Sequence, residues 1–148
     1  QRWPRRLYLY TVSYTHLTLP TTPYVEISGS SVSLKNLTYS LMWVACRLSL
    51  PALNRLRDTF SSEAFNVVAI SVDYVEEDAL DFLARYPVAY PIAIDTTGDS
   101  GRAFSVAGMP SGYLIDKKGM IREIHVGFRK GDEVILQERI AALLAESD

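Results

Sequence analysis

A continuous run of apolar and β-branched residues, from Phe65 to Val72, constrains the fold of this chain more than any other feature. Such a run predicts a strand buried on both faces, as in a parallel sheet. Three acids suited to a first helical turn follow it, at Glu76, Glu77 and Asp78. Together with the elements predicted below, whose order is β-α-β and then β-β-α, this strand predicts an α/β fold with a mixed central sheet and helices on both of its faces.

The pattern after this run predicts the remaining elements of one domain. Strands are expected over residues 90–95, 113–116 and 121–126, with a short helix near 103–104 between the first two. A last helix is expected to start near Asp132 and to bury Val134 and Ile140. A chain of 148 residues is long enough for one domain with a real core.

Composition excludes several classes of function. The net charge of −2 gives no reason to expect a nucleic-acid partner. No run of 18 apolar residues occurs, so no membrane-spanning helix is expected. One cysteine allows neither an internal disulfide nor a thiolate zinc site, and His16 and His125 are too far apart for a metal-binding spacing. The sequence therefore indicates no metal and no cofactor.

Cys46 is the only cysteine in the chain, and an amphipathic segment follows it directly. A helix is expected over residues 47–60, which places Cys46 at a helix N-terminus. Unpaired amides and the helix dipole there lower the pKa of a thiol, and Arg47 adds a cation. The alternative interpretation is that Cys46 is a small apolar residue buried under the helix, with Arg47 serving only packing and solvation.

The segment from Trp43 to Leu53 resembles the active site of the thioredoxin superfamily. It is most similar to the TlpA/ResA-like thiol–disulfide oxidoreductases, or redoxins, with the pattern W-C-x-x-C-R-x-E-x-P-x-L. The resemblance places Cys46 at the second, resolving cysteine, and Trp43 where the nucleophilic cysteine should stand. The expected acid is replaced by Ser49. A dithiol catalyst attacks with one thiolate and releases with another, so the chain as written cannot do both.

A second motif, Val106-x-Gly108-x-Pro110, resembles the other signature of the same superfamily. There the proline is cis and lies beside the cysteine pair, and the preceding residue offers its backbone to a substrate peptide. In this chain that residue is Met109. The resemblance thus implies a thioredoxin-like fold in which Cys46 and Pro110 face one groove and Met109 and Pro110 bind substrate.

Residues 1–35 differ from the rest of the chain. Ser13 to Val25 resembles translated sequencing-adapter sequence, and a genuine Thr/Pro-rich leader is the alternative. We expect a non-native or disordered leader over 1–35 and a thioredoxin-like domain over 36–148. That domain would be truncated at its N-terminus and lack a full first strand, for which only Thr38–Trp43 stands in.

The resemblance implies a thiol–disulfide oxidoreductase that is impaired because the nucleophilic cysteine is absent. A redox-inactive thioredoxin-fold binding module is the alternative. A one-cysteine peroxidase is disfavoured, because peroxiredoxins carry a threonine where Trp43 stands. Family resemblance also implies a protein partner with a disulfide or dithiol, a monomer, and an extracytoplasmic location.

Overall fold

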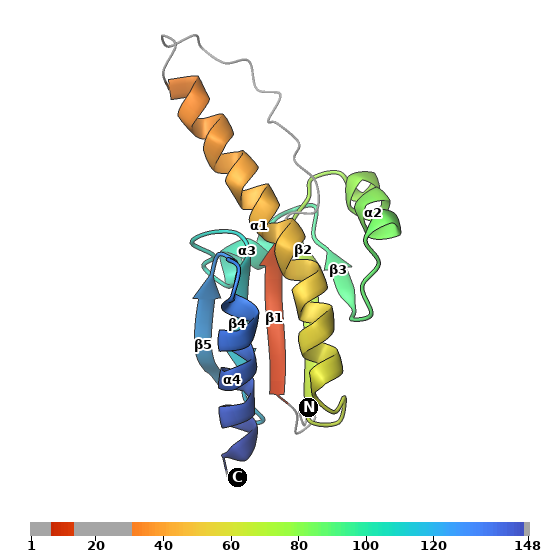
Figure 1. The fold of residues 1–148 in the computed structure, drawn as a ribbon. Helices are drawn as coiled ribbons and strands as arrows, with labels where there is room; N and C mark the ends of the chain where they lie inside the picture. Colours follow the sequence, from red (N-terminus) through yellow and green to blue (C-terminus); the bar gives the residue numbers. More distant parts are fainter. Residues whose placement is uncertain (1–6, 14–30, 147–148) are drawn as a thin grey trace.

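The structure is a computed structural model that describes residues 7–13 and 31–146. Its elements, in chain order, are β1 (Leu7–Ser13), α1 (Ser31–Thr59), β2 (Phe65–Ser71), α2 (Glu76–Arg85), β3 (Ile92–Ile94), α3 (Asp99–Ala103), β4 (Ser111–Ile115), β5 (Ile121–Val126) and α4 (Asp132–Ala145). The strands form one sheet in the order β3-β2-β1-β4-β5 (Figure 1).

The sheet is mixed, as the sequence predicts. β1 runs parallel to β2, and β2 runs parallel to β3. β4 lies antiparallel to β1, with Val12 opposite Ser111, and β5 pairs antiparallel with β4. The carboxyl ends of β1 and β2 therefore lie at the same edge as the start of β4, directly after Pro110.

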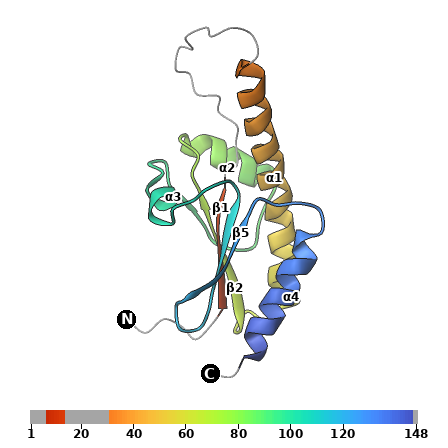
Figure 2. The ribbon, with the colours of Figure 1, turned by 90° about the vertical axis from the view of Figure 1, so that its left-hand side faces the viewer.

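Helices cover both faces of this sheet (Figure 2). α1 and α4 lie on one face, and the short α3 lies on the other. Phe65, Val67 and Ala69 alternate along β2 and belong to the cluster that α1 and α4 cover. A smaller cluster around Val72 and Tyr113 lies under α3. The α/β class predicted from the sequence is confirmed.

The centre of the sheet differs from the expectation. β1 is built from Leu7–Ser13, inside the segment expected to lie outside the fold. Leu7, Leu9 and Thr11 are each at most 3% exposed, because they alternate along the strand and turn toward α1 and α4. The adapter-like segment, apart from Ser13, lies outside the described residues. Its origin stays a prediction, but the expectation that the domain lacks a full first strand is wrong for this structure.

The helix that carries the cysteine also differs. α1 begins at Ser31 rather than near 47, so Thr38–Trp43 is helical and does not stand in for a strand. The physical reason lies in the local sequence, since no glycine or proline interrupts residues 31–50 and Leu34, Leu37 and Leu41 recur at helical spacing. Consequently α1 extends well past the edge of the sheet (Figure 1).

Candidate functional site

Pro110 lies at the edge of the sheet where β1 and β2 end and β4 begins. The Met109–Pro110 peptide bond is cis. The backbone N–H of Gly127 donates to the Pro110 carbonyl at 2.7 Å, and Ser111 Oγ donates to the Gly108 carbonyl at 2.5 Å. The first bond fastens the loop before β4 to the end of β5, and the second closes the loop on itself. Met109 lies half-buried beside a groove.

Cys46 lies in the interior of α1, fifteen residues after the helix begins, and is 0% exposed. The amides of a helix interior are already bonded within the helix, so they do not stabilise a thiolate as an N-terminus would. The expectation that Cys46 stands at a helix N-terminus is therefore wrong. The alternative interpretation, a small buried residue, describes its surroundings in this structure.

α1 presents Ser49, rather than Cys46, to the cis-proline loop. Ser49 and Pro110 line one small void together with Thr11 of β1 and Phe128 after β5. Its volume of about 10 Å³ is too small for a ligand and at the limit for one water. Ser49 Oγ donates to the Cys46 carbonyl at 2.8 Å. The sequence predicts that Cys46 and Pro110 face one groove, but Cys46 is 0% exposed and is not among the residues that line the void at Pro110.

The other residues of the first motif lie along α1. Trp43 stands three positions before Cys46 in the same helix. The Arg47 guanidinium lies over the ring of Tyr86, 5.9 Å from its centroid, and Tyr86 packs against Phe82 of α2. This cation–π contact joins α1 to α2. A tuning effect of Arg47 on Cys46 stays a prediction.

A larger groove of about 360 Å³ opens on the α3 side of the sheet, next to Met109. Its lining comes from three segments that are far apart in the sequence: Val72, Tyr74, Thr97, Gly98, Gly101, Arg102, Ser105, Val106 and Met109. Of these residues, the sequence pointed to Val106, as the start of the second motif, and to Met109, as a substrate-binding residue. A usable signal in the sequence was Tyr74, a large aromatic residue in the loop after the run Phe65–Val72. In the structure, Tyr74 is 68% exposed.

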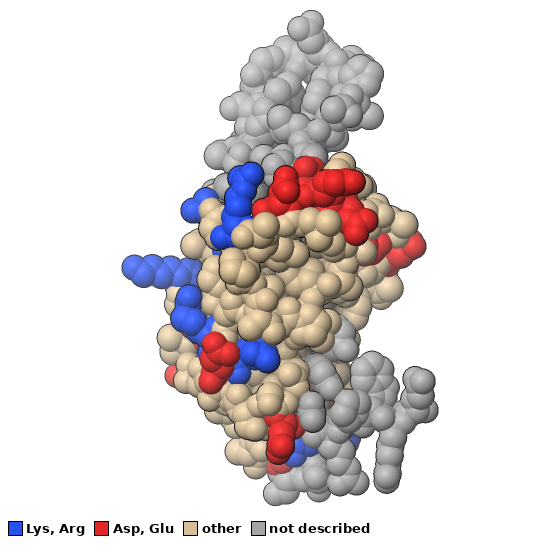
Figure 3. Space-filling view, turned by 90° about the vertical axis from the view of Figure 1, so that its right-hand side faces the viewer, with Lys and Arg blue, Asp and Glu red and all other residues tan. Residues whose placement is uncertain are grey.

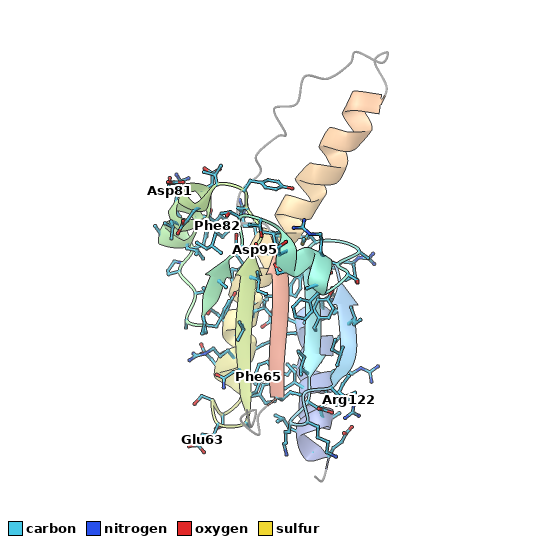
Figure 4. The ribbon with its side chains drawn as sticks, turned by 180° about the vertical axis from the view of Figure 1, so that it is seen from behind. Glu63, Phe65, Asp81, Phe82, Asp95 and Arg122 are labelled. Carbon is cyan, nitrogen blue, oxygen red and sulfur yellow. The ribbon has the colours of Figure 1, made fainter. Side chains whose placement is uncertain are left out.

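Acidic groups gather at this end of the molecule. Figure 3 shows a red patch over α2, whose first turn carries Glu76, Glu77 and Asp78. Figure 4 shows Asp81 and Asp95 at this end of the sheet and Glu63 at the other.

Asp95 orders the loop that leads into α3. Its carboxylate accepts hydrogen bonds from the side chains and backbone amides of Ser100 and Thr97, and from the amide of Gly98. These hydrogen bonds hold the pKa of Asp95 well below its usual range, and the bond from the Ser100 side chain has the largest effect. Asp95 is therefore ionised at neutral pH.

Two further polar pairs flank the site. Asp73, 2% exposed after β2, accepts a hydrogen bond from Ser71 Oγ. His125 Nε2 lies 2.9 Å from Asp132 Oδ2, and this pair connects β5 to the start of α4. Within residues 7–13 and 31–146, no group of three or more acidic, histidine or cysteine side chains could hold a metal ion. In the same ranges, no helix has the length and apolar character to cross a membrane.

Comparison with known families identifies a match that spans most of the chain. Residues 18–140 match the family model described as Redoxin. The thioredoxin-like protein YneN of Bacillus subtilis is 30% identical over 112 residues, covering 68% of this chain and 65% of that protein. The thiol-disulfide oxidoreductase ResA of Bacillus thuringiensis is 26% identical over 108 residues, covering 67% and 62%. The chain therefore spans a little under two thirds of the length of these curated relatives.

Solved structures give the same result for the fold. A crystal structure described as a DsbE thiol:disulfide interchange protein of Chlorobium tepidum has a TM-score of 0.74 at 27% identity, covering 96% of this chain and 82% of that one. A thiol-disulfide isomerase from Corynebacterium glutamicum has a TM-score of 0.69 at 16% identity, covering 98% and 84%. At that lower identity the likeness concerns the fold alone, which is thioredoxin-like.

Proposed function

The chain belongs to the Redoxin family, and we propose that it binds extended polypeptide segments beside Met109 and Pro110 without catalysing dithiol–disulfide exchange. One observation carries the proposal: the only thiol of the chain, Cys46, is 0% exposed inside a continuous helix. The family's chemistry needs one thiolate that attacks and a second that resolves the mixed disulfide. This chain has a single thiol, and no solvent reaches it.

The proposal assigns a role to each predicted site residue. Cys46 occupies the position of the resolving cysteine, and Trp43 the position of the nucleophilic cysteine. Met109 offers its backbone to a substrate segment, which then adds to the site as an extra strand. Arg47 holds α1 against α2 through Tyr86. Binding and redox chemistry thus depend on separate residues: Met109 is half-buried, whereas the thiol of Cys46 is 0% exposed.

The one-cysteine peroxidase is disfavoured by the same burial. A peroxidatic thiolate must contact its peroxide directly, whereas structural cysteines that are buried are unreactive. We therefore expect no consumption of hydrogen peroxide by the folded chain.

The natural setting is proposed from the family. We propose a partner protein that carries a disulfide or a dithiol, a monomeric state for the unbound chain, and an extracytoplasmic location. Binding to a disulfide protein without reducing it would make the chain a holding module for the substrates of an active relative.

An insulin-reduction assay with dithiothreitol tests the lack of turnover. We expect none from the chain as written and none from Trp43→Cys alone. Helix positions three apart hold their Cβ atoms about 5–6 Å apart, whereas a disulfide needs about 3.5–4.5 Å. A third variant deletes residues 14–41 and carries Met42→Trp and Trp43→Cys, so that Ser13 of β1 leads directly into W-C-V-A-C. We expect this variant to gain activity, because the new cysteine then starts the helix.

The matched control is the same deletion with Met42→Trp and Trp43→Ser, which keeps the junction but has one thiol. Turnover by the unmodified chain would overturn the proposal for catalysis. The binding half is tested separately with a reduced and carboxymethylated polypeptide, whose addition should slow hydrogen exchange at the Met109 amide. Unchanged exchange there at saturating polypeptide would contradict a backbone contact at Met109.

A further inference from the structure

β5 forms an outer edge of the sheet, and in the described part of the chain β4 is its only strand partner (Figure 1). The Gly127 amide, directly after β5, donates to the Pro110 carbonyl of the β4 side at 2.7 Å. Hydrogen-bonded residues alternate along an antiparallel strand, so every second residue counted back from Gly127 points its backbone groups at β4. The N–H and C=O groups of Ile124 and Val126 therefore point away from β4, toward the open edge.

The side chains of β5 divide between the two faces of the sheet. Glu123 and His125 contact charged side chains of α4. Ile124 and Val126 alternate with them on the face under α3, where Ile124 lies opposite Tyr113, and they are 57% and 55% exposed. An edge strand with open backbone groups and exposed apolar side chains is a template for pairing with another chain. β5 thus has the properties of an interface strand.

We propose that β5 pairs antiparallel with β5 of a second copy of this chain, about a twofold axis that passes through Ile124 perpendicular to the sheet. The pairing joins the two five-stranded sheets into one. Each copy contributes the same strand, so the interface is isologous and closes at the dimer. The monomeric state proposed above then describes the dissociated chain. The dimer is independent of polypeptide binding at Met109.

The order of side chains along β5 makes the strand complementary to itself in this register. The axis keeps each face on its own side, so Ile124 lies opposite Ile124 of the second copy and Glu123 lies opposite His125 of the second copy. The pairs of Glu123 with His125 are not hydrogen-bonded through the backbone, and in such pairs the side chains lie closest. An acid there meets an imidazole, beside Arg139 and Asp132, which already contact these two side chains within each copy. Charge complementarity therefore favours a second copy as the occupant of this edge.

The two neighbouring registers are less favourable. An axis through Glu123 places this residue opposite itself in a close pair, where like charges are destabilising. An axis through His125 places Glu123 opposite Gly127 of the second copy. Gly127 has a φ of +83°, which is not extended backbone, so the ladder ends before that pair forms. The axis through Ile124 avoids both problems.

Cysteine substitution along β5 tests the register. The two residues at position 124 form a hydrogen-bonded pair, in which Cα atoms lie about 5.5 Å apart. A disulfide accepts Cα distances of about 4.4–6.8 Å. We expect Ile124→Cys, oxidised with diamide, to give a disulfide-linked dimer on a non-reducing gel. Cys46 is 0% exposed, so it does not compete for the oxidant in the folded chain.

Val126→Cys is the matched control for this coupling. Val126 is as exposed as Ile124, but in the proposed register its Cα lies four residues, about 14 Å, from that of its counterpart. We expect it to couple at least about tenfold more slowly than Ile124→Cys, because its thiols are out of disulfide range. Faster coupling of Glu123→Cys or His125→Cys than of Ile124→Cys would overturn the register. Equal coupling at all four positions would indicate collision alone and would overturn the pairing.

Sedimentation equilibrium on the full chain measures the dimer without any covalent bond. We expect the mass to rise from one chain toward two as the concentration increases. Ile124→Lys removes the apolar contact at the axis and places two ammonium groups opposite each other, so the dissociation constant should rise about tenfold or more. Leu80→Lys is the matched control, because Leu80 is 51% exposed on α2, at the other side of the sheet from β5. It should dimerise as the parent chain does, and circular dichroism checks that both variants are folded.

The outcomes separate this inference from the proposed function. A parent chain with the mass of one chain at every concentration would overturn the dimer, whatever the coupling at position 124. Equal dissociation constants for the parent chain and Ile124→Lys would overturn the placement of the interface on β5. Neither result concerns Met109, and Ile124→Lys should still show slower hydrogen exchange at the Met109 amide when the carboxymethylated polypeptide is added.

Discussion

The two faces of the sheet differ in how completely buried apolar side chains fill them. The face under α1 and α4 is filled by one continuous cluster with side chains from β1, β2, β4 and both helices, and its largest members, such as Phe65 and Ile140, are 0% exposed. The face under α3 has two fully buried apolar residues, Val72 and Tyr113, and half-buried neighbours around them. A helix of five residues cannot cover that face, so a groove remains.

This contrast shows how one sheet can supply both stability and a binding surface. Burial of apolar area is the dominant favourable term in folding, and here most of it lies on one face. The other face can then keep an exposed tyrosine and a left-handed serine without endangering the fold. We expect substitutions on the two faces to differ accordingly.

The largest expected effect is at the centre of the filled face. Phe65→Ala should lower the free energy of unfolding by about 3–5 kcal/mol, because Phe65 is fully buried and its ring packs edge-on against Phe60 at 5.6 Å. Phe104→Ala, on the face under α3, is the comparison and should cost less than half as much. Urea unfolding followed by circular dichroism measures both, and equal losses would contradict the contrast.

A smaller effect on the same face depends on pH. Burial alone would raise the pKa of Asp132, but hydrogen bonds from the Arg129 amide and from His125 outweigh burial, and the pKa is lowered overall. Because the folded pKa is the lower one, Asp132 stabilises the fold above the unfolded value of about 3.9. That stability is lost as the pH falls through the folded pKa.

The variant Asp132→Asn should therefore be less stable than the parent chain at pH 7, by about 1–2 kcal/mol. The difference should shrink as the pH falls below the unfolded pKa and through the lowered folded pKa of Asp132, because the parent carboxylate is then protonated. Urea titrations at a series of pH values measure it. A difference independent of pH would mean that the charge of Asp132 is not what stabilises the loop before α4.

On the groove face, Tyr113→Phe removes the hydrogen bond to the Phe104 carbonyl. We expect a loss of about 1 kcal/mol in the free energy of unfolding. Because that bond fixes the segment next to Ser105, we also expect faster hydrogen exchange at the Ser105 and Val106 amides. A stability loss with unchanged exchange at these amides would show that the hydrogen bond does not hold this segment.

The smallest global effect is expected for Asp95→Asn. Asp95 orders a short surface loop, so the midpoint of unfolding should move little while hydrogen exchange at the Gly98 and Ser100 amides becomes faster. Nuclear magnetic resonance resolves these amides individually. Exchange rates unchanged from the parent chain would show that the backbone alone holds this loop.

Much of the fold could be predicted where local pattern and tertiary position agree. The run at Phe65–Val72 became β2, and residues 121–126 became β5 with the predicted limits. The last helix begins at Asp132 as predicted, but Val134 is 59% exposed because Leu136 and Ile140 occupy the buried face. Periodicity identified the element and the burial of Ile140 correctly, and only Val134 was assigned to the wrong face.

The centre of the sheet could not be predicted, because a strand is central only through its partners. Leu7–Ser13 has the alternation of a half-buried strand, but its composition and its adapter-like continuation predict a segment outside the fold. Its role follows from pairing with β2 and β4, which lie far along the chain. For the same reason the groove was missed, since α3, Tyr74 and Met109 come together only in the fold.

The burial of Cys46 has a consequence for experiments on folding. The single thiol of this chain is 0% exposed, so an alkylating reagent can react only with molecules that have opened around α1. When closing is faster than alkylation, the labelling rate is the rate of an unprotected thiol multiplied by the fraction of open molecules. The rate of thiol loss from Cys46 in native buffer therefore measures the equilibrium between closed and open forms of α1, and the measurement needs no denaturant.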